Sequence, residues 1–348
     1  MKDNFAKLGK GRFSLREIPR FGPILILILI ALPIASSSSK FYLSILFSMF
    51  LYAGVSVAWN LIAGYGGQVS FGHAAFFGLG AYTSTLLFTK FGISPWIGIL
   101  AGGFISCLFA TMIGVPCFRL RGLFFALSTM AFGLAVETAV INLPKLTKGS
   151  IGLFILFKPG VKNLMFESAV AYAYVALAFL LLTVFITWLI ERSKLGYQLV
   201  AVREDEEAAK MLGVPTTLVK QIVFNISVFL TSTAGVLFAQ YYLFIDPTSV
   251  FTWLIVQKAM LFTIIGGMGT LWGPVVGTLL LMPLLEVIRL IFGEAVGFYL
   301  LLYGIILILG IIFMPMGIMG ILASRFKRTK ARPNMISSDS VQTVLEDR

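Results

Sequence analysis

Long apolar segments alternate with short polar ones along most of this 348-residue chain. Most of the apolar segments reach the roughly 20 residues that a helix needs to cross about 30 Å of hydrocarbon. The ten candidate spans cover residues 21–39, 41–63, 72–89, 93–118, 123–143, 169–190, 222–245, 251–265, 271–288 and 296–313. The pattern therefore predicts an all-α polytopic membrane protein with roughly 8–10 transmembrane helices, ten being the favoured count.

Clusters of basic residues indicate how these spans are oriented. They lie at the N-terminus, at Arg119 and Arg121, in 192–220 and from Arg325 onward. Cytoplasmic loops carry such an excess of Lys and Arg, so ten spans place both termini in the cytoplasm. Segment 144–168 holds four lysines and is nonetheless expected outside.

The expected domains follow from this topology. They are a basic cytoplasmic N-terminus (1–20), a transmembrane domain (21–314) with a cytoplasmic loop (191–221), and a basic, partly disordered cytoplasmic tail (315–348).

Composition excludes several classes of protein. Apolar residues make up 58% of the chain and charged residues 12%, with a mean hydropathy of +0.95. The net charge of +12 comes mostly from the flanking clusters, which suit anionic membrane lipids rather than nucleic acid. With one histidine, His73, and no close pair of intramembrane carboxylates, we expect no catalytic residues, no metal and no cofactor. A GxxxxGK[ST] loop is also missing, so any ATP would be hydrolysed by a separate polypeptide.

A glycine-rich polar segment interrupts the apolar pattern between residues 58 and 82. Backbone at membrane depth leaves the helical form only against protein or a watery cavity, and transporters build their paths at such breaks. Amide and hydroxyl groups can replace the water around a zwitterion, which favours Gln68 and Ser70. His73 has two interpretations, a hydrogen bond within the break, which is favoured, or contact with substrate. The residues expected to line a path are Gly66, Gly67, Gln68, Ser70, Gly72 and His73.

A second glycine cluster echoes the first. Gly266 and Gly267 followed by Gly273 repeat the order of Gly66 and Gly67 followed by Gly72. One interpretation is that two related halves place Gly266 and Gly267 beside the same path. The alternative is that small residues let helices pack closely, as in the pairs Gly98 with Gly102 and Gly273 with Gly277.

The loop between the sixth and seventh spans contains a stretch, 198–215, that favours a helix. Acidic residues from Glu204 to Glu207 load its start, Lys210 lies toward its end, and Gly213 and Pro215 stop it. This charge order suits the helix dipole. One interpretation is that a partner protein binds this helix and moves the two flanking spans together. The alternative is a solvated connecting helix.

Several motifs resemble one family. Glu207, Ala208 and Ala209 followed by Gly213 are similar to the signature of the cytoplasmic loop in ABC importer permeases. The segments 60–82, 116–133 and 266–277 resemble the membrane subunits of branched-chain amino acid ABC importers, over about residues 51–310. Two departures, Thr147-Lys148-Gly149 in the outer loop and Lys258 within a span, keep urea open as a substrate.

This resemblance implies a permease subunit in a bacterial plasma (inner) membrane. Its expected partners are two ATP-binding subunits, a second related permease subunit, an amino-acid substrate, and a periplasmic or lipid-anchored substrate-binding protein. The residues implied in ATPase coupling are Glu204, Asp205, Glu207, Ala208, Ala209 and Gly213. The residues expected to dock the binding protein are Lys145, Lys148, Lys158 and Lys162. The alternatives are a permease for urea or another small polar solute, and a secondary transporter or channel.

Overall fold

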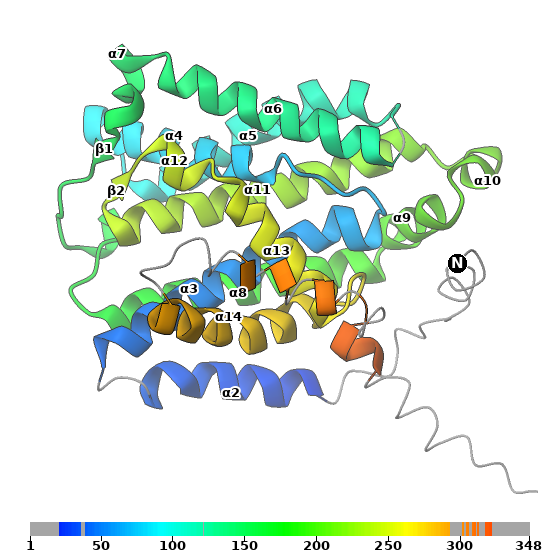
Figure 1. Ribbon diagram of the computed structural model, residues 1–348. Helices are drawn as coiled ribbons and strands as arrows, with labels where there is room; N and C mark the ends of the chain where they lie inside the picture. The colour runs from blue at the N-terminus through cyan, green and yellow to red at the C-terminus, as the bar shows by residue number, and fades with distance from the viewer. Residues whose placement is uncertain are drawn as a thin grey trace, which may run out of the picture.

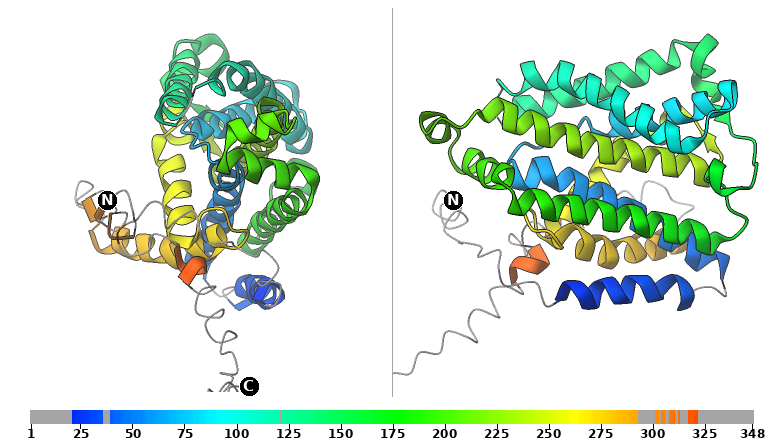
Figure 2. Two further views of the ribbon diagram at one scale, coloured as in Figure 1. Left: turned by 90° about the vertical axis from the view of Figure 1, so that its right-hand side faces the viewer. Right: turned by 180° about the vertical axis from the view of Figure 1, so that it is seen from behind.

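Long helices run side by side in one bundle (Figure 1 and Figure 2). The computed structural model describes residues 21–35, 39–120, 122–292, 301–302, 304–305, 308–310, 312 and 317–321. The elements in chain order are α2 (Phe21–Ala35), α3 (Lys40–Asn60), η1 (Leu61–Tyr65), α4 (His73–Phe91), α5 (Pro95–Cys117), α6 (Leu123–Ile141), α7 (Pro144–Thr147), η2 (Gly149–Ile151), β1 (Leu153–Phe154), η3 (Val161–Asn163), α8 (Ala169–Arg192), α9 (Lys194–Glu204), α10 (Glu206–Met211), α11 (Thr216–Tyr242), β2 (Phe244–Ile245), α12 (Pro247–Val250), α13 (Trp253–Gly266) and α14 (Gly273–Phe292). The expected all-α class is confirmed.

Six described segments are long and apolar enough to cross a membrane. They are α3 with η1, α5, α6, α8, α11, and α12 with α13. Helices α2 and α14 contain shorter apolar stretches, Leu25–Ile34 and Gly273–Ile288, and α4 occupies the expected span 72–89. The structure describes only short pieces of the expected span 296–313. A multi-pass membrane protein is therefore confirmed, and the count of ten stays a prediction.

Helix α11 begins earlier than the sequence pattern indicates. The expected span starts at residue 222, whereas the helix starts at Thr216. The difference arises because Lys220, whose side chain is 1% exposed, is paired with Glu206 at 2.7 Å between Nζ and Oε2. A paired ammonium can lie inside a helix bundle, whereas the pattern treats any lysine as a boundary.

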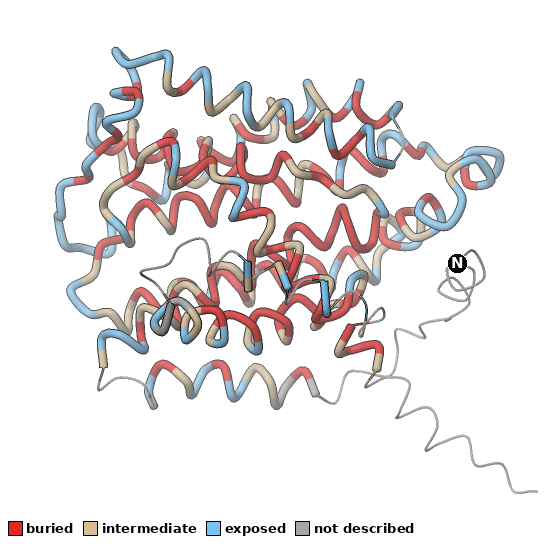
Figure 3. Tube along the Cα trace, in the orientation of Figure 1, coloured by how far each residue is buried: buried red, intermediate tan, exposed pale blue. Residues whose placement is uncertain are grey.

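The bundle has a buried centre and a more exposed layer. Helices α3 and α11 are mostly buried, whereas α5 and α6 expose most of their length (Figure 3). Helix α6 lies along one outer side of the bundle (Figure 1). Its exposed apolar side chains include Leu123, Phe124 and Leu134. An apolar outer face of this kind suits contact with lipid or with another membrane protein.

The two ends of the bundle carry different structures. At one end, here called the β1 end, lie α7, β1 and β2 (Figure 1). Strands β1 and β2 are antiparallel, with Leu153 opposite Ile245 and Phe154 opposite Phe244. At the opposite end, here called the α9 end, α9 and α10 connect α8 to α11 (Figure 1). The expected outer loop 144–168 and the expected cytoplasmic loop 191–221 thus lie at opposite ends.

Glycines allow several helices to approach closely. A Cβ atom on Gly235 of α11 would lie 1.9 Å from the carbonyl oxygen of Phe77 in α4. A Cβ on Gly102 of α5 would lie 3.1 Å from the Cα of Gly80, and one on Gly277 of α14 would lie 2.0 Å from the Phe262 carbonyl. The close-packing interpretation of the small-residue pairs is therefore confirmed.

Candidate translocation and coupling site

The first glycine segment is a turn that separates α3 from α4. Helix α3 widens into the π-helical η1 at Leu61–Tyr65 before it ends. The Gln68 amide then donates to the Ile62 carbonyl at 3.0 Å, and Gly67 has φ +67°, a left-handed conformation that glycine adopts without strain. Helix α4 begins at His73. Residues 66–72 are called the first glycine turn below.

The second glycine segment separates α13 from α14 in a similar way. Gly266 ends α13 and Gly273 begins α14. The hydroxyl of Thr270 donates to the Gly267 carbonyl at 2.8 Å and accepts from the Gly273 amide at 3.1 Å, so it satisfies backbone groups at both sides of the turn. Residues 267–272 are called the second glycine turn.

Asn60, in the last turn of α3, joins the two glycine segments. Its Oδ1 accepts from the Gly269 amide at 2.8 Å, and its Nδ2 donates to the Thr270 carbonyl at 2.9 Å. A Cβ on Gly64 would lie 1.9 Å from Asn60 Oδ1 and 2.5 Å from the Gly269 nitrogen. The absence of a side chain at Gly64 therefore permits the contact, and the second turn lies against the end of α3 and η1.

Ser70 and His73 form a buried hydrogen-bonded cluster behind the first turn. His73 Nδ1 lies 3.0 Å from Ser70 Oγ, and Nε2 lies 2.8 Å from Ser227 Oγ on α11. The Ser227 hydroxyl donates its proton to the Ala58 carbonyl at 2.5 Å, so it can only accept from Nε2. Nε2 of His73 is then the donor, and in the neutral ring Nδ1 accepts from the Ser70 hydroxyl. The favoured interpretation, a hydrogen bond within the break, describes this geometry.

Neighbouring helices fix the position of the first turn. Trp59 Nε1 donates to the Ser70 carbonyl at 2.8 Å. From α6, Thr129 Oγ1 accepts from the Phe71 amide at 3.0 Å, and its carbonyl oxygen lies 2.8 Å from where a Cβ on Gly72 would be. The three sequence motifs that carry the family resemblance therefore meet at this turn and its neighbour.

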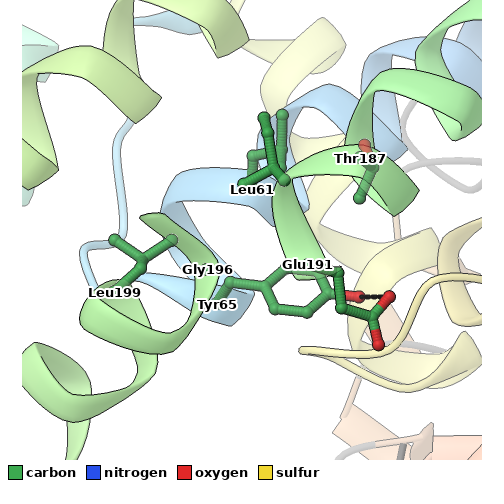
Figure 4. A pocket seen from close by; sticks show the side chains of 7 residues that line it. Leu61, Tyr65, Thr187, Glu191, Gly196 and Leu199 are labelled. Atoms are coloured by element: carbon green, nitrogen blue, oxygen red, sulfur yellow. Dashed lines mark hydrogen bonds between the residues drawn. The ribbon is translucent and has the colours of Figure 1, made fainter. Parts of the chain in front are cut away.

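Helix α9 lies against η1 and the first turn. Leu199 reaches within 3.3 Å of the Cβ position of Gly66. Beside it, a narrow recess with essentially no room for water is lined by residues of η1, α8 and α9 (Figure 4). The Tyr65 hydroxyl donates to Glu191 Oε2 across this recess at 3.4 Å (Figure 4). Arg203, in the last turn of α9, donates from Nη1 to the Gly64 carbonyl at 2.8 Å.

The acidic segment forms a short separate helix. Asp205 is extended, with φ −155° and ψ 107°, and its Oδ1 accepts from the amides of Glu207 at 2.9 Å and Ala208 at 3.0 Å. It therefore caps α10. The expectation of one helix from Glu204 to Gly213 was wrong at its start, because Glu204 ends α9 and the cap follows it. Gly213, with φ +81°, follows the helix as expected.

Glu206 ties α10 to α11. Its carboxylate lies 2.7 Å from Lys220 Nζ and 3.1 Å from Lys210 Nζ, and it accepts from the Thr216 hydroxyl at 3.2 Å. Burial acts to raise the pKa of Glu206, but hydrogen bonds from both lysines and their charges outweigh it, so its pKa lies below the ordinary value. The residues at the tip of the loop are exposed to solvent, Met211 by 90% and Leu212 by 83%.

The residues expected to line a path differ in exposure. Gly66, Ser70, Gly72, His73, Gly266 and Gly267 are buried, Gln68 is half-buried and Gly67 is exposed. The structure places them in or beside two turns toward the α9 end, and Asn60 of α3 holds the second of these turns. Their role in a path stays a prediction.

The remaining expected site residues lie at the two ends of the bundle. Among the coupling residues, Glu204, Asp205, Glu207, Ala208 and Gly213 are exposed and Ala209 is buried. Lys145, Lys148, Lys158 and Lys162 are all exposed in the segment at the β1 end. Their proposed partners remain to be tested.

Sequence reasoning missed the residues that hold the turns together. Asn60 and Thr129 are polar residues inside apolar spans, where a polar group needs a partner, and this signal was available. Arg203 precedes the acidic run, and nothing in the sequence distinguishes it from the other basic residues of this loop. Lys258, a departure noted in the sequence, places its Nζ 4.9 Å from the centre of the Tyr52 ring.

These features define a polytopic membrane protein whose interrupted helices meet beneath a helical loop. Residues 41–311 match the family described as the permease component of the branched-chain amino acid transport system, and the chain belongs to this family. No solved structure matches the chain.

Several curated relatives share this similarity. The chain is 28% identical to the high-affinity branched-chain amino acid transport system permease protein LivM of Salmonella typhimurium, over 85% of this chain and 73% of the relative. It is 27% identical to LivM of Escherichia coli over the same shares. It is 26% identical to the LivH permease protein of the same-named system of Salmonella typhimurium, over 77% of this chain and 91% of the relative.

Proposed function

We propose that this chain is the membrane-embedded permease subunit of an ATP-driven importer for branched-chain amino acids. The observation that carries the proposal is the arrangement at the α9 end in a member of this family. A loop projecting from the bundle is bonded through Arg203 to the Gly64 carbonyl in η1, and Asn60 at the end of α3, the helix that η1 continues, is bonded to the second glycine turn. Force applied to such a loop would reach the interrupted helices, where transporters place their path.

Two ATP-binding subunits would supply the force from the cytoplasm. The α10 tip offers them an apolar surface, Met211 and Leu212, beside the acidic side chains of Glu204, Asp205 and Glu207. Exposed apolar side chains rimmed by polar ones are typical of protein interaction sites. The chain would then lie in the bacterial inner membrane with the α9 end, and both termini, in the cytoplasm.

A second related permease would complete the path. Helix α6 is largely exposed, yet it carries Glu137, which is only half-buried. A carboxylate facing hydrocarbon costs about 2.5–3.5 kcal/mol on insertion scales, so this face is better suited to protein or water than to lipid. Salmonella typhimurium has both a LivM and a LivH permease protein of one named transport system. A sister permease lying against α6 fits both observations.

A periplasmic or lipid-anchored binding protein would deliver the substrate at the β1 end. The four exposed lysines of the 144–168 segment offer it a positive surface, and such charge guides encounter with an acidic partner. A substrate leaving this protein would pass toward Gln68 and the first glycine turn.

Uptake into proteoliposomes tests the proposal. The chain, a sister permease and two ATPases are reconstituted with ATP on the side of α10, and labelled leucine or urea is added with the corresponding binding protein. We expect ATP-dependent leucine uptake and no urea uptake. ATP-dependent urea uptake without leucine uptake would support the urea alternative. Leucine uptake that runs on an ion gradient without ATP would support a secondary transporter.

A further inference from the structure

One cationic side chain touches both glycine turns. Arg203 Nη1 donates to the Gly64 carbonyl at 2.8 Å. The same Nη1 lies 2.9 Å from where a Cβ on Gly269 would be, and Arg203 Cγ lies 2.9 Å from where a Cβ on Gly67 would be. The stem of Arg203 therefore packs on the first turn while its guanidinium reaches the backbone of the second.

The Gly64 carbonyl is a position where force can act. It belongs to the last turn of the helix, where carbonyls have no partner within the helix and carry the negative end of its dipole. A guanidinium bound there makes a charge-assisted hydrogen bond, which is stronger than a neutral one. Because Gly64, Gly67 and Gly269 have no side chains, the contact acts on the backbone of both turns.

The other end of this contact belongs to the projecting loop. Arg203 lies two residues before Asp205, which ends α9 and caps α10, while Glu206 bonds α10 to Thr216 and Lys220 of α11. A movement of α10 must therefore either shift α9 or break its cap. Any shift of α9 carries the guanidinium with it.

We propose that Arg203 is the positioning residue that transmits movement of α9 and α10 to both glycine turns. The inference rests on the proposed function for the source of the movement. Asn60 completes the connection, because it binds the second turn from the helix whose end Arg203 holds. A purely structural cap would stabilise the end of α3 but would not make the second turn respond to the loop.

The test uses the assembled complex in nanodiscs, with wild type, Arg203→Gln and the control Lys194→Gln. Lys194 is exposed at the start of α9, so the control removes the same charge from the same helix. Hydrogen exchange is measured in residues 64–72 and 267–272 with and without a non-hydrolysable ATP analogue. Amino-acid uptake per ATP hydrolysed is measured on the same preparations.

We expect nucleotide to change exchange in both turns of the wild type and of Lys194→Gln. In Arg203→Gln this response disappears in both turns, ATP hydrolysis stays within about twofold, and uptake per ATP falls at least about tenfold, as expected for a lost charged hydrogen bond. A wild-type response in either turn, or wild-type uptake per ATP, would overturn the proposal.

Two further measurements keep the result interpretable. If Arg203→Gln does not assemble, Arg203→Lys retains the charge on a single ammonium, and we expect it to preserve the response of the first turn but lose that of the second. A full response in both turns would refute the inference. If the wild-type complex shows no ATP-dependent uptake, the proposed function is wrong, independently of the inference about Arg203. Hydrogen exchange measured without nucleotide still tests the inference. Both glycine turns must then exchange faster in Arg203→Gln than in Lys194→Gln.

Discussion

Replacement of Asn60 by alanine should release the second glycine turn from α3. Asn60 is fully buried, and its amide satisfies two backbone groups, the Gly269 N–H at 2.8 Å and the Thr270 carbonyl at 2.9 Å. A buried backbone group left without a partner costs about 1–3 kcal/mol, so two of them cost about 2–6 kcal/mol. Alanine recovers about 0.6 kcal/mol of helix propensity, and entry of water recovers part of the rest, which leaves about 1–4 kcal/mol.

Hydrogen exchange of residues 267–272 measures this change directly, because the Gly269 amide itself donates to Asn60. At about 1.4 kcal/mol for each factor of ten, exchange should accelerate roughly 5- to 700-fold in Asn60→Ala. The matched control is Asn142→Ala, an exposed asparagine that caps α6 and donates to the Thr138 carbonyl of that helix, and it should change exchange little. A folded Asn60→Ala protein whose 267–272 segment exchanges at the wild-type rate would refute the reasoning.

Three other predictions follow from the packing and the charges. Gly235→Ala should destabilise the purified protein by about 1–3 kcal/mol in detergent unfolding, because the added Cβ meets the Phe77 carbonyl. Gly133→Ala, with open space around it, should be neutral or stabilising. Equal effects of the two substitutions would contradict the close-packing account. The pKa of Glu206 is depressed, so its ion pair with Lys220 stabilises α10 fully above the unfolded-state pKa and is lost as pH falls through the folded-state pKa. Hydrogen exchange of residues 206–211 should therefore rise on acidification, and in Glu206→Gln these residues should exchange fast at every pH. A pH-dependent step in exchange that persists in Glu206→Gln would oppose the assignment. Reversing the exposed charges at the β1 end should weaken binding-protein docking and uptake several-fold with normal membrane insertion, and unchanged uptake would dispose of that docking site; the substitutions are to glutamate at Lys145, Lys148, Lys158 and Lys162.

The helices and the glycine turns could be predicted from the sequence because both are local signals. A run of apolar residues predicts a span, and a run of glycines predicts its interruption, without knowledge of neighbours. The start of α11 could not be predicted, because Lys220 is tolerated only through a partner on α10. The start of α10 depends likewise on Asp205 acting as a cap rather than as a helical residue.

Contacts between distant segments were beyond the sequence pattern. Asn60 and Thr270 are 210 residues apart, and no periodicity indicates which helix ends meet. The echo between the two glycine clusters left two interpretations, related halves beside one path and close packing of helices. The glycines do let the helices approach closely, and the second turn is bonded to Asn60 at the end of α3, whereas the role of related halves in a path stays a prediction.

The central claim is that this permease does not move solute by itself and is operated through the loop at the α9 end. The most direct measurement is leucine flux into liposomes containing the purified chain alone, compared with liposomes containing the full assembly and ATP. The account predicts no flux above that of empty liposomes for the chain alone, and ATP-dependent flux for the assembly. Steady leucine flux through the chain alone would contradict it.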